Sequence, residues 1–384
     1  MSQPALPGRG RIAAIDFWRG LVLVFIFINH IPGNFLDRIT PRNFGFSDST
    51  EAFVFIAGLS VALAWGGRIG RQDLRSVVER AWHRTYVLYG VHLLLTFTAI
   101  ALYANAFVLT GNDTFLLDHG RDVIFEEPGT ALLGIVFLGH QMGYYNILPL
   151  YILLVFLSPF LLLAAWRGPL LTLAVSFVIY VIAQLPQVNL PSWPLPGLWV
   201  FNPFAWQFAF VAGMTVGVLA RRDGVRIPAS RPLLLACAVF VAASVFVVAD
   251  GFGLAPGLFG TVYGFGGFDK TDMSIMRFVH FLALAYLVTQ LRIGERLVGF
   301  DWGRATALVG RHGLAIFALG SVLSSAGQIY TTLIDGTRWS NGTLTGLVIV
   351  PAGVMCLYWF ARFLESRTVP AIPAPAKRTR AATA

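Results

Sequence analysis

Long apolar runs separated by short polar loops occupy most of the chain between residues 14 and 362. About 20 consecutive apolar residues are enough to span a bilayer as a helix, so these runs predict a polytopic, all-α transmembrane helical bundle of about ten spans. The runs are continuously apolar and do not alternate with polar residues, which excludes an outer-membrane β-barrel. The predicted spans cover residues 14–33, 51–66, 85–108, 145–165, 169–186, 204–220, 232–250, 273–291, 305–328 and 343–362.

The segments outside these spans complete the expected domain organisation. We expect a cytoplasmic N-terminal tail over residues 1–13, a single transmembrane domain over 14–362, and a disordered basic cytoplasmic tail over 363–384. The apolar segment 130–140 is too short to cross a bilayer, so it is predicted to be re-entrant or interfacial.

The composition supports a membrane protein. The 384 residues are 56% hydrophobic and only 12% charged, with a mean hydropathy of +0.70. A soluble domain carries about twice that charged fraction, which excludes a soluble enzyme, a disordered protein and a collagen-like fibre. The net charge is +9, and twenty of the 28 Lys and Arg residues fall on the side of the predicted topology that holds both termini, against five on the other side. The positive-inside rule therefore predicts cytoplasmic termini, with the lipid bilayer and not nucleic acid as the partner.

The first predicted span carries three ionisable side chains, which are costly inside a membrane and are therefore candidates for function. Arg19 and His30 are eleven residues apart in the sequence, which places them within ~20° on one helix face and ~16 Å apart along its axis. Asp16 precedes Arg19 by three residues and can pair with it. Such a stripe suits a long ligand with a charged head and a reactive end, such as acyl-coenzyme A. The alternative is that Asp16 and Arg19 anchor one end of the helix and His30 caps the other.

The same stretch is part of a series of recognisable sequence segments. They are RIAAIDFWRG (11–20), NHIPGNF (29–35), FSDSTEAFVFIAGLS (46–60), NILPLYILL (146–154), FNPFAWQFAFVAGM (201–214) and GRHGLAIFALG (310–320). The Arg19-x10-His30 spacing resembles the motif of the acyltransferase-three superfamily of membrane acyltransferases. The surrounding segments resemble the OpgC-type glucan succinyltransferases, from about residue 11 to residue 362.

This resemblance implies transfer of a succinyl group from succinyl-coenzyme A onto hydroxyls of a periplasmic glucan at the bacterial inner membrane. Acyl-coenzyme A would be a co-substrate from the cytoplasm, with no permanently bound cofactor. An acetyl donor, and another envelope carbohydrate or a lipid-linked sugar as acceptor, remain alternatives. By position, His30 matches the catalytic histidine of the family and Arg19 its motif arginine, which would contact the coenzyme.

A catalytic histidine needs a carboxylate that holds its second ring nitrogen and stabilises the imidazolium. Asp48 and Glu51, at the outer start of the second predicted span, are the candidates. The alternative for Glu51 is an acidic residue that complements the positive end of a helix dipole.

Two arginines after the second span are candidates for binding the coenzyme phosphates. The superfamily has an Arg-x-x-Arg element here, whereas this chain has three residues between Arg80 and Arg84. Side chains at i and i+4 share a helix face and can grip phosphate together. The alternative is that both serve as positively charged membrane anchors.

Three further residues are candidates for substrate binding. Asn202 and Trp206 open the sixth span from the outer side, where a sugar would arrive, although an interfacial aromatic belt explains them equally well. Arg277 could pair with the carboxylate of a succinyl group. A structural ion pair with Asp269 or Asp272 is the alternative.

No histidine or carboxylate cluster in the sequence has metal-ligand spacing, so no metal site is expected. A transporter or flippase for an envelope carbohydrate or lipid-linked sugar is the competing functional class, because ionisable residues within spans also suit transport. A structural membrane protein would leave the shared face of Arg19 and His30 unexplained.

Overall fold

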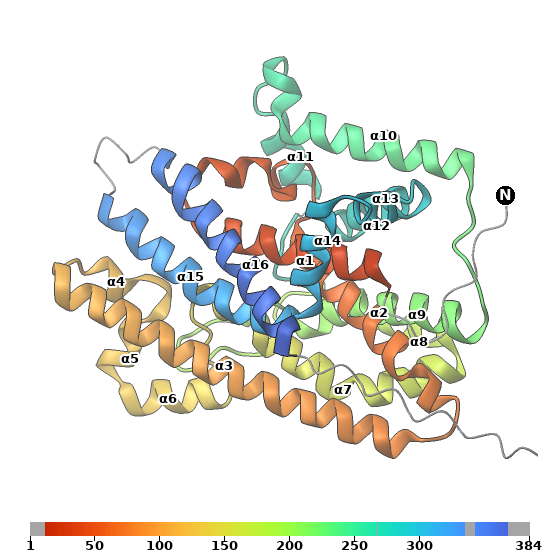
Figure 1. Cartoon of the computed structure of the whole chain (residues 1–384), viewed down its shortest axis with the longest axis horizontal. Helices are drawn as coiled ribbons and strands as arrows, with labels where there is room; N and C mark the ends of the chain where they lie inside the picture. The colour runs from red at the N-terminus through yellow and green to blue at the C-terminus, as the bar shows by residue number, and fades with distance from the viewer. Residues whose placement is uncertain (1–11, 267, 335–341, 368–384) are drawn as a thin grey trace, which may run out of the picture.

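The computed structural model describes residues 12–266, 268–334 and 342–367, and this part of the chain is all-helical, as predicted (Figure 1). An isolated β-bridge between Pro191 and Leu198 is the one β-type pairing among the described residues. Most of the expected tails, residues 1–11 and 368–384, lie outside the described residues.

Seven helical segments in the described chain are long and apolar enough to cross a membrane. Two shorter apolar helices, α8 (Pro169–Ile182) and α12 (Ile275–Gln290), accompany them. The count of ten spans and the side of the membrane that holds the termini stay predictions. The seven segments contain α2 (Ser49–Ile69), α3 (Leu74–Thr110), α7 (Ile147–Arg167), α9 (Pro203–Arg222), α10 (Arg231–Val248), α15 (Gly313–Ile334) and α16 (Val350–Arg367).

Helix α1 (Ala13–Asn29) lies inside the bundle, where it packs against α14 (Asp301–Arg311), α2 and α15 (Figure 1). Helices α3 and α7 pack along one side of the molecule. Helix α10 packs on α12 at the opposite side, and its apolar side chains are largely exposed, as expected of a helix that faces lipid.

Several helix boundaries differ from the predicted spans. Helix α1 ends at Asn29 and not near residue 33, because Pro32 and Gly33 follow and do not continue a helix. The predicted span 305–328 is divided at His312 into α14 and α15. The segment 130–140 overlaps the short helix α6 (Pro128–Val136), whose nine residues do not cross a bilayer.

Glycines allow α1, which carries Arg19, to pack closely on α14, and α2 to pack closely on α9. A methyl group on Gly58 of α2 would overlap the backbone carbonyl of Phe210 in α9, and one on Gly310 of α14 would overlap the carbonyl of Asp16 in α1. Small residues allow such backbone contact between helices in a membrane. The spacing of α1, α2, α9 and α14 therefore depends on these glycines.

We expect Gly58→Ala to destabilise the protein by about 1–3 kcal/mol, the usual range for overpacking. Gly90→Ala in α3 is the matched control, because nothing lies within 4 Å of the added methyl group. Thermal unfolding of the detergent-solubilised protein measures both. Equal melting temperatures for the two variants would show that α2 and α9 tolerate separation.

Candidate functional site

Three hydrogen-bond acceptors, from α1, α2 and α14, hold the side chain of Arg19 in place. Its guanidinium donates to Asp16 Oδ1 at 3.2 Å, to Ser60 Oγ of α2 at 2.6 Å and to the carbonyl of Gly310 in α14 at 3.4 Å. The predicted pairing of Asp16 with Arg19 is therefore present in the structure. These contacts fix the guanidinium against two other helices.

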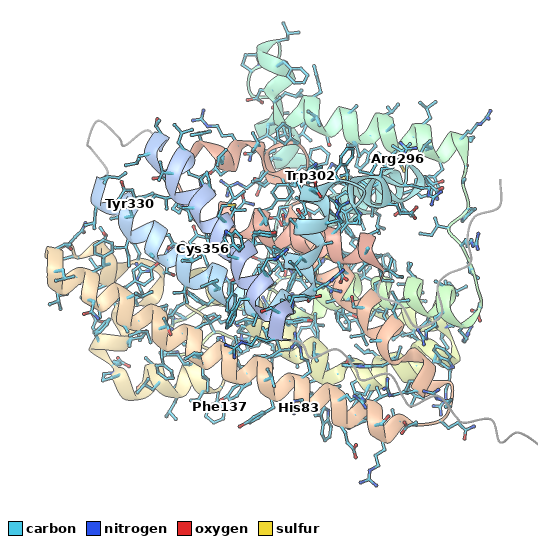
Figure 2. All side chains as sticks on the ribbon, viewed as in Figure 1. His83, Phe137, Arg296, Trp302, Tyr330 and Cys356 are labelled. Atoms are coloured by element: carbon cyan, nitrogen blue, oxygen red, sulfur yellow. The ribbon has the colours of Figure 1, made fainter. Side chains whose placement is uncertain are left out.

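Arg19 lines a cavity of about 480 Å³, which we call the Arg19 cavity. Arg80, His83 and Arg84 of α3 line the same cavity, together with Arg311 at the end of α14; Figure 2 labels His83 on α3. Within the described residues, Arg80 and Arg84 form no ion pair. The cavity thus brings several cations together and leaves two of them available to an anion.

His30 directly follows α1 and lines a second cavity of about 230 Å³, which we call the His30 cavity. The ring of His30 lies against that of Tyr144, with 4.6 Å between the ring centroids. The backbone carbonyl of His30 accepts a 2.6 Å hydrogen bond from Gln328 Nε2, and Gln328 Oε1 accepts one of 2.5 Å from the hydroxyl of Tyr103. These contacts fix both the ring and the backbone of His30.

Phe53 of α2 is the side chain that the two cavities share. Its ring packs against Tyr151 and Phe317, with centroids 5.5 and 6.4 Å apart, and both of these rings line the Arg19 cavity. Arg19 and His30 therefore open into two neighbouring cavities with Phe53 at their boundary.

The two candidate carboxylates start α2 and have different surroundings. Asp48 is the N-cap, where its side chain accepts from the backbone of Thr50 at 2.7 Å, and Glu51 Oε2 accepts from the backbone N–H of Asp48 at 2.9 Å. Asp48 lines the His30 cavity, whereas Glu51 is fully buried and does not line it. Neither carboxylate hydrogen-bonds the His30 ring in the described part of the chain.

Arg277 and Lys270 neutralise these carboxylates. Arg277 pairs with Glu51 at 2.7 Å and with Asp48 at 3.2 Å, and Lys270 pairs with Asp48 at 2.7 Å. Burial alone would raise the pKa of Asp48, but the charges of Lys270 and Arg277 lower that pKa below its usual range. Asp48 is therefore ionised at neutral pH.

The structure gives Arg277 other ion-pair partners than the two aspartates considered from the sequence, and its role in substrate binding stays a prediction. Its guanidinium is engaged with Glu51 and Asp48 rather than with Asp269 or Asp272. It does not line the His30 cavity, so a carboxylate of a bound acyl group would not meet it there.

Asn202 and Trp206 are fully buried and lie outside the lining of both cavities. Asn202 caps α9 and donates from Nδ2 to Asp272 and to the carbonyl of Val188, both at 2.7 Å. Trp206 Nε1 donates to the carbonyls of Lys270 and Thr271 at 3.1 and 3.0 Å. Both side chains thus anchor the loop that carries Lys270.

Tyr144, Arg42 and Lys270 are among the cavity residues that were not predicted as site residues from the sequence. Tyr144 is 114 positions from His30 in the sequence, and Arg42, twelve positions after His30, belongs to a separate 3-10 helix, so no shared helix or motif linked either residue to His30. Lys270 could have been noticed in the sequence, because it and Lys377 are the only lysines of the chain and Lys377 belongs to the expected tail.

Comparison with protein families matches the family described as OpgC protein over residues 11–367. The chain belongs to the OpgC protein family. As an OpgC protein, it is a membrane-associated acyltransferase of the glucan-modifying type. Comparison with curated proteins and with solved structures gave no match.

The expected absence of a metal stays a prediction. Within the described residues no three His, Cys, Asp or Glu side chains are grouped so that they could hold an ion.

Proposed function

We propose that this OpgC protein is an acyl-coenzyme A-dependent O-acyltransferase that moves a succinyl group onto hydroxyls of a periplasmic glucan, with His30 as general base. The observation that carries the proposal is the pair of cavities along α1. One contains Arg19 and the other contains His30, and Phe53 lines both. A ligand with an anionic head and a reactive group at the end of a long arm matches this arrangement.

The Arg19 cavity suits the phosphates of the donor. Arg80 and Arg84 are one helical turn apart on α3 and have no ion-pair partner in the described chain. Arg19 and Arg311 line the same cavity but are paired with Asp16 and Glu365, at 3.2 and 2.9 Å. Arginine forms paired, charge-assisted hydrogen bonds with phosphate oxygens. The rest of the lining is mainly apolar, including Phe53, Leu148 and Phe317, which suits the uncharged arm of the donor.

In the proposed reaction, the thioester carbonyl lies in the His30 cavity. The neutral imidazole of His30 removes the proton of a glucan hydroxyl as the hydroxyl oxygen attacks the thioester carbon. The C–S bond then breaks, and the imidazolium returns the proton to the leaving thiolate. The products are an ester on the glucan and free coenzyme A thiol.

Asp48 supports this role of His30 by its charge. It lines the same cavity, and its carboxylate favours the imidazolium that forms during the reaction, against the opposing charges of Lys270 and Arg42 in that cavity. Glu51 acts one step further away, because it holds Arg277 against Asp48 and caps α2.

The proposed topology is ten spans in the bacterial inner membrane, with both termini in the cytoplasm. The excess of Lys and Arg in the loops on the side of the termini supports this orientation. Cytoplasmic acyl-coenzyme A would then enter through the Arg19 cavity, and the glucan would reach the His30 cavity from the periplasm.

Replacing Arg80 and Arg84 together with alanine should raise the apparent KM for the acyl-coenzyme A donor by about tenfold or more, because charge-assisted hydrogen bonds contribute about 1.5–3 kcal/mol each. The turnover number at saturating donor should change little. Arg75→Ala is the matched control, because Arg75 lies on the same helix but is exposed and pairs with Glu79 at 2.8 Å. An unchanged donor KM in the double variant would move the phosphate site elsewhere.

Mass spectrometry of the glucan tests the transfer itself. The purified protein is incubated with succinyl-coenzyme A and a glucan, and the glucan is examined for ester-linked succinyl groups. Acylated glucan supports the proposal, whereas an unmodified glucan with intact donor contradicts it.

A further inference from the structure

Two cations from separate loops line the His30 cavity. Arg42 lies in the short 3-10 helix η2 (Pro41–Asn43), and Lys270 lies in the loop before α12. Their side chains are 44% and 43% exposed, so both are accessible to a ligand. The cavity therefore contains two cationic side chains beside His30, with Asp48 as the one carboxylate among its lining residues.

Lys270 is held in place by contacts on both its side chain and its backbone. The ammonium group pairs with Asp48 at 2.7 Å and lies 5.7 Å from the centroid of the Phe201 ring. Trp206 Nε1 binds the Lys270 carbonyl, and the backbone N–H of Asn202 donates to the carbonyl of Thr271 at 3.0 Å. The loop is thereby anchored to the start of α9.

Arg42 is fixed relative to the end of α1. Its guanidinium pairs with Asp37 at 2.7 Å. The hydroxyl of Thr40, two residues earlier, donates to Asn29 Oδ1 at 2.7 Å and to the carbonyl of Asp37 at 2.6 Å. Since Asn29 directly precedes His30, these bonds tie the Arg42 loop to the proposed base.

We infer that Arg42 and Lys270 bind the terminal carboxylate of the acyl group, and so select a dicarboxylic acyl donor such as succinyl over acetyl. The inference rests on the proposed function, since it places the thioester beside His30. Asp48 is already shared between Lys270 and Arg277, so the lining retains positive charge for a second carboxylate. An acetyl group lacks that carboxylate and gains nothing from either cation.

This inference transfers the role first considered for Arg277 to Arg42 and Lys270. Arg277 is 12% exposed and engaged by two carboxylates, whereas Arg42 and Lys270 each have one carboxylate partner among the described residues and line the cavity. Asn202 and Trp206 then act as positioning residues, because they hold the Lys270 loop.

The test compares two donors on the purified full-length protein in detergent. Thiol release is measured with succinyl-coenzyme A and with acetyl-coenzyme A, each with a glucan acceptor, for the wild type, Arg42→Gln and Lys270→Gln. Each substitution should lower kcat/KM for the succinyl donor by about tenfold or more relative to kcat/KM for the acetyl donor, as expected for a lost charged hydrogen bond to the succinyl carboxylate. Lys270→Arg should retain most of the preference for succinyl.

Arg38→Gln is the matched control, because Arg38 is exposed on the preceding 3-10 helix, η1 (Phe35–Ile39), and does not line the cavity. It should leave the ratio of the two kcat/KM values unchanged. Equal losses with both donors in Arg42→Gln and Lys270→Gln would overturn the inference. A wild-type protein that prefers acetyl would also overturn it while leaving the proposed transferase intact. Absence of thiol release with either donor would instead contradict the proposed function.

Discussion

Replacing His30 with alanine should lower the rate of acyl transfer by about 10²- to 10⁴-fold, which is the usual contribution of a positioned general base. His30→Gln should do the same, although glutamine preserves much of the size of the imidazole. The physical reason is that neither side chain accepts a proton from the attacking hydroxyl. Steady-state thiol release at saturating donor and glucan measures the effect.

Because the His30 ring packs on Tyr144, its loss could also disturb local structure. Melting temperature and elution in size-exclusion chromatography are therefore recorded for each variant, and His30→Gln is the more conservative of the two. A folded His30→Gln protein with near wild-type turnover would rule out His30 as the base.

Replacing Arg277 with methionine should destabilise the protein by about 3–5 kcal/mol, because breaking a buried ion pair leaves an uncompensated charge. Glu51 is fully buried, and Arg277 is the cation that pairs with it within the described residues. Asp48 would keep its ion pair with Lys270, so Glu51 is the carboxylate left without a cationic partner among the described residues. Thermal unfolding in detergent measures the change.

The double variant Arg277→Met with Glu51→Gln separates the ion pair from the loss of packing. Removing both charges should recover part of the stability that Arg277→Met loses, since no buried carboxylate is then left alone. The single variant should also reduce turnover with succinyl and acetyl donors to the same extent, in contrast to Arg42→Gln. If the double variant were less stable than Arg277→Met by the full cost of Glu51→Gln, the two charges would not be coupled.

The sequence predicted the relative positions of candidate site residues where both residues lie in the same helical stretch. Arg19 and His30 could be placed on a common face because both lie in a single apolar run, and Arg80 and Arg84 could be paired because a helix brings i and i+4 together. The all-α fold likewise followed from run length and composition, and it is confirmed for the described chain.

Contacts between distant segments could not be read in this way. Arg277 was predicted to pair with a succinyl carboxylate, with a nearby aspartate as the alternative, but the structure pairs it with Glu51, 226 positions away, across the contact between α2 and α12. Lys270 and Arg42 are 228 positions apart in the sequence and line one cavity only because the fold brings their segments together. The break at His312 was also missed, because the apolar residues on the two sides of Arg311 and His312 were interpreted as one span.

The most direct test of the central claim is acceptor-dependent thiol release by the purified, detergent-solubilised protein, with His30→Gln measured in parallel. Succinyl-coenzyme A is supplied with and without a glucan, and free thiol is followed over time. We predict thiol release that requires the glucan and is lost in His30→Gln. Release that is independent of the glucan, or equal in the variant, would contradict a glucan acyltransferase with His30 as its base.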